Sequence, residues 1–293
     1  MANGQWFPEE WPERIRALAR GTLTPAVPKR AATVMLLKDT DAGPVVHMLR
    51  RRASMAFAGG AYAYPGGGVD PRDDEPGIRW AGPTRAWWAR RLGVDEAEAQ
   101  ALVCAAVRET YEEAGVLLAG DAPDTVVGDT TGADWEADRA ALVERELSFG
   151  QFLERRGLVL RSDLLGAWTR WITPEFEPRR YDTFFFVAAL PAGQRTRNAS
   201  TEADRTVWTR PAEAAARYDR GELLMMPPTL ATLRQLVPYA SAADALAAAP
   251  ARDLTAVLAR ARLDGDEVVL SWPGHDEFTR RVPTDLPTGG APV

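Results

Sequence analysis

Residues 105–118 read AAVRETYEEAGVLL and carry Arg108, Glu109, Glu112 and Glu113 within six positions. An α-helix advances about 100° per residue, so the three glutamates share one face of a helix over this stretch. Arg108 lies four positions before Glu112 and can pair with it on the helix surface. The opposite face carries side chains that can pack into a core: Val103, Val107, Thr110, Tyr111 and Ala114.

The clustered carboxylates have two explanations. Glu109 and Glu113 are like charges one turn apart, which costs a helix about 0.2–0.5 kcal/mol, and no lysine lies between them. A solvated acidic face is the ordinary explanation of such a run. A divalent cation would instead turn the repulsion into attraction, and carboxylates with no His or Cys beside them suit a hard ion such as Mg²⁺ or Mn²⁺. The residues alone leave both explanations open.

Composition sets the outer bounds. The 293 residues are 46% hydrophobic, enough for one large domain or one domain with substantial extensions. A net charge of −6 argues against a general binder of nucleic acid or anionic membranes. Cys104 is the only cysteine, which excludes an intrachain disulfide, and we expect it to be buried. With no apolar signal core and no run of membrane-spanning length, we expect a cytoplasmic protein with no nucleic-acid or membrane partner.

The periodicity of apolar residues predicts a mixture of strands and helices. Strands are predicted at 31–37, 44–50, 116–118, 164–174, 181–191, 205–210 and 266–272. Helices are predicted at 13–20, 85–92, 96–114, 135–146, 149–156, from 211, at 228–237 and at 254–263, and residues 56–77 are expected to be loop. Thr84 and Asp95 are the expected N-caps of the second and third helices, with Gly93 and Gly115 after their ends. This order lacks a steady βαβ rhythm and favours an α+β or α/β/α layered fold.

Two stretches resemble the Nudix box, whose pattern is G-x5-E-x7-R-E-U-x-E-E-x-G-U with U apolar. The segment RETYEEAGV (108–116) matches its second half, and YPGGGVDPRDD (64–74) resembles its first half with Gly67 as the box glycine. Asp73 stands where the first glutamate belongs, and Thr110 stands at an apolar position. Residues 74–107, 34 in number, occupy a place where the pattern has seven, an insertion of 27.

A box split in this way is similar to that of the peroxisomal-type coenzyme A diphosphatases, as are the stretches AFAGGAYAYPGGGVD, LLGAWTRWITPEFEPRRYDTFFF and MMPPTLATLRQL. The resemblance implies an α/β fold, a Nudix-type α/β/α sandwich with a mixed sheet and extra C-terminal helices. It implies a Nudix domain over 30–240 with a helical insertion at 74–100. Residues 1–29 would be an N-terminal extension, and residues 241–293 a C-terminal extension packed on the domain.

The same resemblance implies a metal-dependent hydrolysis of a diphosphate. Glu112 and Glu113 would bind Mg²⁺ or Mn²⁺, and Glu109 would be a third ligand or would position water. The backbone carbonyl near Gly67 could complete the coordination, because glycine lets the main chain approach closely. Arg108 would hold the helix carboxylates in place.

A general base could come from another loop, where Glu202 is the first candidate and Asp204 the second. The alternative for Glu202 is a surface acid that precedes a strand. A homodimer is compatible with the sequence, which leaves the oligomeric state open.

Substrate contacts are expected from arginines and aromatic residues. Arg179, Arg180 and Arg52 could meet phosphate, because guanidinium groups bind it through two hydrogen bonds; a structural ion pair with Asp182 is the alternative for the first two. Tyr64 could stack on an adenine or be simply core, and the same holds for Tyr62 and Phe57.

The expected substrate is coenzyme A or acyl-coenzyme A, cleaved to 4′-phosphopantetheine and adenosine 3′,5′-bisphosphate. Ala56, where another Nudix branch carries an arginine motif for coenzyme A, argues against it. ADP-ribose, NADH or another nucleoside diphosphate derivative is the alternative substrate. A non-catalytic ligand-sensing module ranks lower because all three glutamates of the helix are present.

Overall fold

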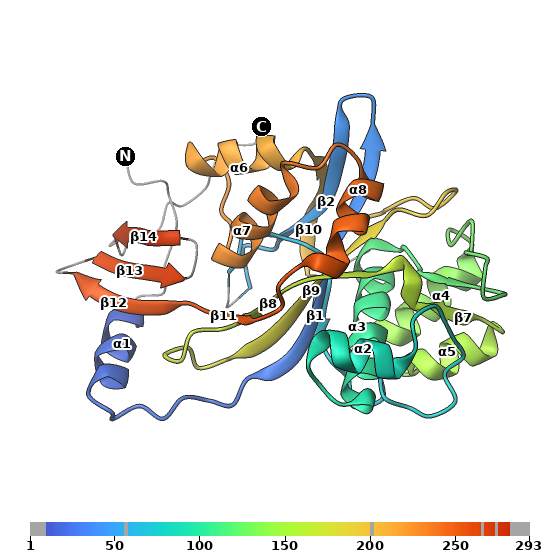
Figure 1. Cartoon of the computed structure of the whole chain (residues 1–293), viewed down its shortest axis with the longest axis horizontal. Helices are drawn as coiled ribbons and strands as arrows, with labels where there is room; N and C mark the ends of the chain where they lie inside the picture. Colours follow the sequence, from blue (N-terminus) through green and yellow to red (C-terminus); the bar gives the residue numbers. More distant parts are fainter. Residues whose placement is uncertain (1–9, 56–57, 200–201, 265–266, 273–274, 282–293) are drawn as a thin grey trace.

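A computed structural model of the chain describes residues 10–55, 58–199, 202–264, 267–272 and 275–281. Its centre is a mixed eight-stranded sheet with the order β10-β2-β1-β9-β8-β11 (Figure 1). In addition, β3 pairs with β2 and β4 pairs with β1. These strands are β1 (Lys29–Thr40), β2 (Gly43–Arg51), β3 (Tyr62–Ala63), β4 (Gly66–Gly68), β8 (Gly166–Ile172), β9 (Tyr181–Ala189), β10 (Ala203–Thr209) and β11 (Ala256–Leu258). The parallel pair β1 and β9 forms the middle, and Lys29 is in register with Tyr181.

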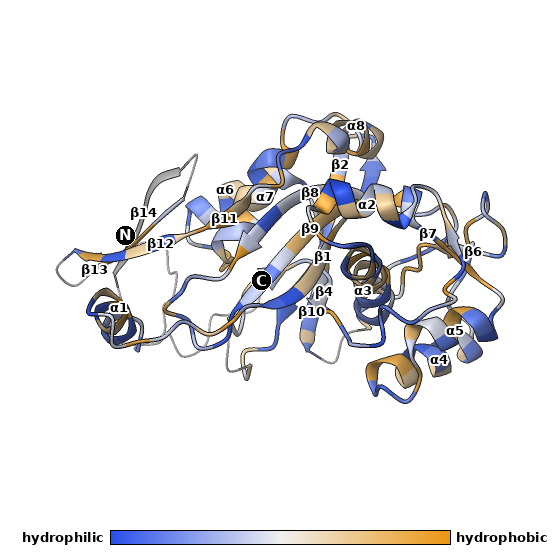
Figure 2. Cartoon of the chain, turned by 60° about the horizontal axis from the view of Figure 1, so that its bottom comes forward, coloured by the Kyte–Doolittle hydropathy of each residue, from blue (hydrophilic) through white to orange (hydrophobic). Residues whose placement is uncertain are grey.

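Helices cover both faces of this sheet. Successive side chains of a strand point to opposite faces, so Val34 and Leu36 pack on one side while Met35 and Leu37 pack on the other. The first side is covered by α2 (Arg85–Leu92), α3 (Glu96–Ala114), α4 (Ala133–Val143) and α5 (Phe149–Arg155), and the second by α1 (Trp11–Ala19), α6 (Pro211–Asp219), α7 (Pro227–Leu236) and α8 (Ala242–Ala248). Figure 2 shows α3 on one side of the sheet, α6 and α7 on the other, and a largely hydrophobic β9 between them. The predicted α/β/α class is confirmed.

Helix α3 begins and ends as its sequence predicts. The Asp95 carboxylate accepts a hydrogen bond from the backbone N–H of Glu98, and Gly115 ends the helix with a φ of 71°, in the left-handed region. The apolar face is fully buried against β1 and β9, with Cys104 inside it. Thr110 fits this core because its hydroxyl donates to the carbonyl of Ala106 at 2.7 Å.

The segment inserted into the box is folded onto the same core. It contains β5 (Trp80–Ala81) and α2, and β5 joins β7 (Val159–Arg161) and β6 (Ala119–Gly120) in a small sheet. Trp88 of α2 is buried, with its ring 5.9 Å from that of Phe186 in β9. The predicted domain boundaries stay predictions, although β11 shows that part of 241–293 adds a strand to the main sheet.

Residues 254–263 correct the prediction, because they form β11 and β12 (Arg260–Asp264) rather than a helix. Strand β11 pairs with β8, and β12 pairs with β13 (Glu267–Trp272), which pairs in turn with β14 (His275–Arg281). Strict alternation of apolar and charged residues from Ala259 to Asp264 was the sequence signal for a strand.

Smaller differences concern short strands. The strand expected at 116–118 lies at β6 instead, and the expected loop at 56–77 contains β3 and β4. These strands are two or three residues long and pair with distant segments, so no local sequence pattern predicts them. Within the described residues, no helix is both long and apolar enough to cross a bilayer.

Candidate active site

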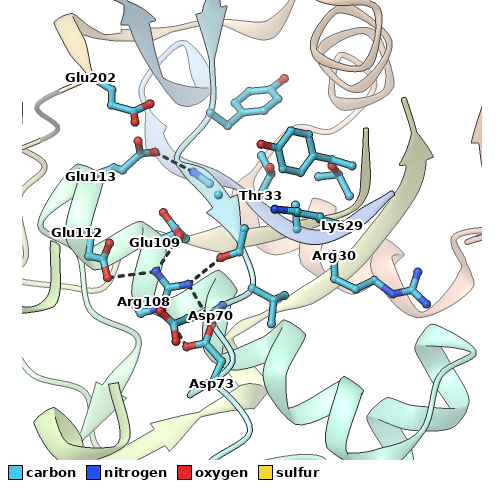
Figure 3. Close-up of a pocket in the computed structure, with 18 of the residues that line it drawn as sticks. Lys29, Arg30, Thr33, Asp70, Asp73, Arg108, Glu109, Glu112, Glu113 and Glu202 are labelled. Carbon is cyan, nitrogen blue, oxygen red and sulfur yellow. Dashed lines mark hydrogen bonds and ion pairs between the residues drawn. The ribbon is translucent and has the colours of Figure 1, made fainter. Parts of the chain in front are cut away.

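A cavity of about 1140 Å³ lies where β4, α3 and the sheet meet (Figure 3). Alternate residues of two parallel strands line one side: Lys29, Ala31 and Thr33 of β1, and Tyr181, Thr183 and Phe185 of β9. The glutamates of α3 line another side, next to the glycines of β4. Residues from the end of α4 to the start of α5 and from the start of α7 also contribute to the lining: Leu142, Val143, Arg145, Leu147, Ser148, Phe149, Met226, Pro228 and Thr229.

Arg108 is the centre of the charged cluster. Its guanidinium binds both carboxylate oxygens of Asp73 at 2.9 and 3.0 Å, and donates to Glu109 at 2.7 Å and to Glu112 at 3.2 Å. It also donates to the carbonyl of Gly68 at 2.9 Å. Asp73 is 1% exposed, so the residue that replaces the box glutamate still forms a buried two-point pair. Arg108 thus connects the two halves of the split box.

Strand β4 brings the backbone close to α3. The N–H of Gly66 donates to the Glu113 carboxylate at 2.8 Å. At Gly67, an added Cβ would lie only 2.6 Å from the Glu109 carboxylate, so this close approach requires glycine. The predicted neighbours Gly67, Glu109 and Glu113 therefore lie together.

Burial controls the charge of the cluster. It raises the pKa of Glu109 to about 7, and the nearby Glu112 charge adds to the shift while Arg108 opposes it. Burial likewise raises the pKa of Glu112 and, despite the paired Arg108, that of Asp73. A bound cation would favour the charged forms of these carboxylates.

The donor chemistry of the cluster fits a hard divalent cation, since it offers carboxylate and backbone oxygens only. In the part of the chain that the structure describes, no three acidic or histidine side chains converge closely enough to hold an ion as they stand. Arg108 and the Gly66 N–H engage the carboxylate oxygens instead. A metal at Glu109, Glu112, Glu113 and Gly67 stays a prediction.

Glu202 lines the same cavity from the segment before β10. Its side chain is 56% exposed and lies 3.9 Å from the guanidinium of Arg51. Figure 3 shows Glu202 and Glu113 on the same side of the cavity. Asp204, the second candidate base, is paired with Arg50 at 2.7 Å and does not line the cavity.

The structure separates the predicted substrate contacts. Arg179 lines the cavity, but Arg180 is buried and donates to the carbonyls of Thr173 at 3.0 Å and Ala26 at 2.7 Å. Of the two arginines, only Arg179 therefore faces the cavity. Arg180 is therefore a structural residue, although Asp182 is not its partner.

Arg52 also requires correction, whereas the role of Tyr64 stays a prediction. Arg52 does not line the cavity; Arg51, one position earlier at the end of β2, does. Tyr64 lines it but is 3% exposed, and its hydroxyl donates to the carbonyl of Thr229 at 3.2 Å, so little of the ring is left for stacking. Tyr62 is buried as well, and Phe57 and Ala56 lie outside the described residues.

Lys29 and Tyr181 are among the cavity residues that the sequence reasoning missed. The signal was available, because Lys29 continues the alternation of Ala31 and Thr33, and Tyr181 continues that of Thr183 and Phe185. This alternation identifies cavity residues only when β1 and β9 are known to lie side by side.

Comparison with solved structures places this fold among the Nudix hydrolases. The chain is similar to the crystal structure of a NUDIX hydrolase from Alicyclobacillus acidocaldarius, with a TM-score of 0.63 and 29% identity. The match covers 76% of this chain and 96% of that one.

The chain belongs to the Nudix family, because residues 85–236, 152 of the 293, match the NUDT19 Nudix domain. It is 30% identical over 161 residues to "Acyl-coenzyme A diphosphatase NUDT19" of Gallus gallus, covering 48% of this chain and 42% of the relative. It is 24% identical over 200 residues to the protein of the same name from Xenopus laevis, covering 60% and 50%. The chain thus spans about half the length of these curated relatives.

Proposed function

We propose that the chain is a metal-dependent Nudix diphosphatase that cleaves coenzyme A or acyl-coenzyme A to 4′-phosphopantetheine and adenosine 3′,5′-bisphosphate. The observation that carries this proposal is the set of three α3 glutamates that line one cavity beside the glycines of β4. The names of the chicken and frog relatives support the choice of coenzyme A over other diphosphates.

Glu109, Glu112 and Glu113 would hold a divalent cation together with the backbone carbonyl of Gly67. Such an ion, when bound, neutralises phosphate charge and acidifies water. Arg108 contributes by fixing two of the carboxylates through hydrogen bonds of 2.7 and 3.2 Å. Its buried pair with Asp73 prevents it from moving toward the substrate instead.

Glu202 is the proposed general base. It takes a proton from the water that attacks one phosphorus, the bond from that phosphorus to the bridging oxygen breaks, and the leaving phosphate carries away the negative charge. Arg51 lies 3.9 Å from the Glu202 carboxylate and forms an ion pair with it. The cavity volume of about 1140 Å³ exceeds the roughly 300–1,000 Å³ of pockets for small ligands, which suits a substrate as long as coenzyme A.

A substrate panel tests the proposal. Coenzyme A, acetyl-coenzyme A, ADP-ribose and NADH are compared with Mg²⁺ or Mn²⁺, and the products are identified. We expect coenzyme A and its acyl form to be cleaved fastest. Glu112→Gln and Glu113→Gln should each lower kcat about a thousandfold with the fold intact, equivalent to about 4 kcal/mol of transition-state stabilisation.

The outcomes separate the parts of the proposal. Faster cleavage of ADP-ribose or NADH would overturn the coenzyme A assignment and leave the diphosphatase. Near-wild-type turnover by both variants would overturn the metal site. Binding without hydrolysis of any compound would favour a ligand-sensing module.

A further inference from the structure

The cations that line the cavity fall into two groups. Seven cationic residues contribute to its surface: Lys29, Arg30, Arg51, Arg72, Arg108, Arg145 and Arg179. Five of them pair with carboxylates: Arg30 with Glu98 and Asp182, Arg51 with Glu202, Arg72 and Arg145 with Asp70, and Arg108 with Asp73 and two box glutamates. Among the described residues, the side chains of Lys29 and Arg179 form no hydrogen bond or ion pair.

The backbone places these two free cations together. The N–H of Lys29 donates to the carbonyl of Arg180 at 2.9 Å, so the start of β1 is bonded to the residue after Arg179. The buried guanidinium of Arg180 also donates to the carbonyl of Ala26, which ties the two segments a second time. Arg180 therefore positions Arg179 while pointing away from the cavity itself.

An exposed aromatic ring lies beside them. Tyr181 is in register with Lys29 on the neighbouring strand, lines the cavity and is 39% exposed. Arg179, Tyr181 and Thr183 follow one another at every second position, and all three line the cavity. In Figure 3, Lys29 lies across the cavity from Glu112 and Glu113, whereas the Arg30 side chain extends away from these glutamates.

Unpaired cations and an exposed ring suit one class of ligand group, a nucleotide that carries a phosphomonoester. Phosphate accepts charge-assisted hydrogen bonds from Lys and Arg, and a nucleobase can stack on a tyrosine ring. A phosphate near the box glutamates would meet carboxylates instead, unless a cation lay between them.

We infer that Lys29 and Arg179 bind the 3′-phosphate of coenzyme A, with the adenine against Tyr181. This inference rests on the proposed function and assigns the substrate an orientation: the adenosine end lies over β1 and β9, and the diphosphate lies at α3. The arginines of β2, by contrast, take no part in reading the 3′-phosphate.

The test compares two substrates that differ only in that phosphate. Lys29→Gln and Arg179→Gln should each lower kcat/KM for coenzyme A about tenfold to a hundredfold and leave kcat/KM for dephospho-coenzyme A within about twofold. Arg145→Gln is the matched control: it removes an exposed cation from the same cavity and should leave the ratio of the two substrates unchanged. Calorimetry adds a readout without turnover, in which adenosine 3′,5′-bisphosphate should bind wild type more tightly than adenosine 5′-phosphate and lose that advantage in Arg179→Gln.

The two proposals fail separately. Equal loss on both substrates, or no loss on either, would overturn the 3′-phosphate site while hydrolysis by wild type upholds the diphosphatase. If wild type cleaves neither substrate, the proposed function falls; equal binding of the two nucleotides by calorimetry would then overturn the site on its own.

Discussion

The side chain of Asp73 holds the two halves of the split box together. It is one methylene shorter than the glutamate of the family pattern, yet both its oxygens bind Arg108. Its backbone neighbour Asp70 also donates an N–H to it at 2.8 Å, which holds the loop against the helix. The insertion can therefore be long without separating the halves, because a buried two-point pair closes the gap between them.

Gly67 offers a test at the same scale. Gly67→Ala should displace the Glu109 carboxylate, since the new Cβ would lie 2.6 Å from it. We expect kcat to fall about a hundredfold, as misplaced catalytic groups cause, and stability to change by less than about 1 kcal/mol because only a side-chain end must move. Gly68→Ala is the control, with its nearest neighbour 4.0 Å away. Steady-state kinetics and thermal unfolding measure both; wild-type kcat in Gly67→Ala would remove Glu109 from the site.

At the scale of elements, the insertion lengthens the box helix rather than interrupting it. Helix α3 spans 19 residues and starts twelve positions before Arg108. Its first half buries Ala99, Leu102 and Val103 in the same core as α2 and the even positions of β1. The carboxylates thus project from a helix that is anchored along its whole length.

The N-cap of α3 should matter for stability and not for chemistry. Asp95→Ala should cost about 1 kcal/mol of unfolding free energy, because the N–H of Glu98 loses its acceptor. The cap lies about 27 Å along the helix from Glu113, at 1.5 Å per residue, so kcat should not change. Asp95→Asn keeps an acceptor and should unfold close to wild type in denaturant titrations. An equal loss in both variants would mean that the charge, and not the hydrogen bond, stabilises the helix.

At the scale of the whole molecule, segments far apart in the chain meet at the cavity. The turn that carries Arg179 packs against α1, where the ring of Trp11 lies 4.9 Å from that of Phe176. Arg14 of α1 donates to the carbonyl of Phe176. The N-terminal helix therefore supports the proposed phosphate site although it contributes no side chain to it.

Glu177 in this contact gives a dependence of stability on pH. It is 5% exposed, and burial raises its pKa to about 7 from 4.5. The folded state then binds more protons than the unfolded state between these values, so its contribution is fully present below about pH 4.5 and is lost as pH rises through 7. Denaturant unfolding at pH 5 and pH 8 should show that wild type loses about 2–3 kcal/mol more than Glu177→Gln. Glu175→Gln, exposed and two positions away, should behave like wild type; the same pH response in Glu177→Gln would contradict the assignment.

Local rules account for the parts of the fold that the sequence predicted well. The period of α3, its Asp95 cap and its terminal Gly115 depend on residues within a few positions of one another, and all are as predicted. Residues 254–263 fit a helix or a strand by local pattern, and the choice depends on β8 and β13, which lie elsewhere in the chain. Pairing with these strands decides between helix and strand, because the tertiary context of a segment can override its local preference.

The sequence by itself determined which residues share the acidic face of α3, because helical geometry is a property of the segment alone. Only the tertiary structure decided which cations face the cavity: Arg51 rather than Arg52, Arg179 rather than Arg180, and Lys29 beside them. The sequence indicates that consecutive side chains point to different sides of the backbone, but it does not indicate on which side the cavity will lie. That side is set by packing between β1, β9, α3 and α7, which lie far apart in the chain; Lys29 of β1, for example, is in register with Tyr181 of β9.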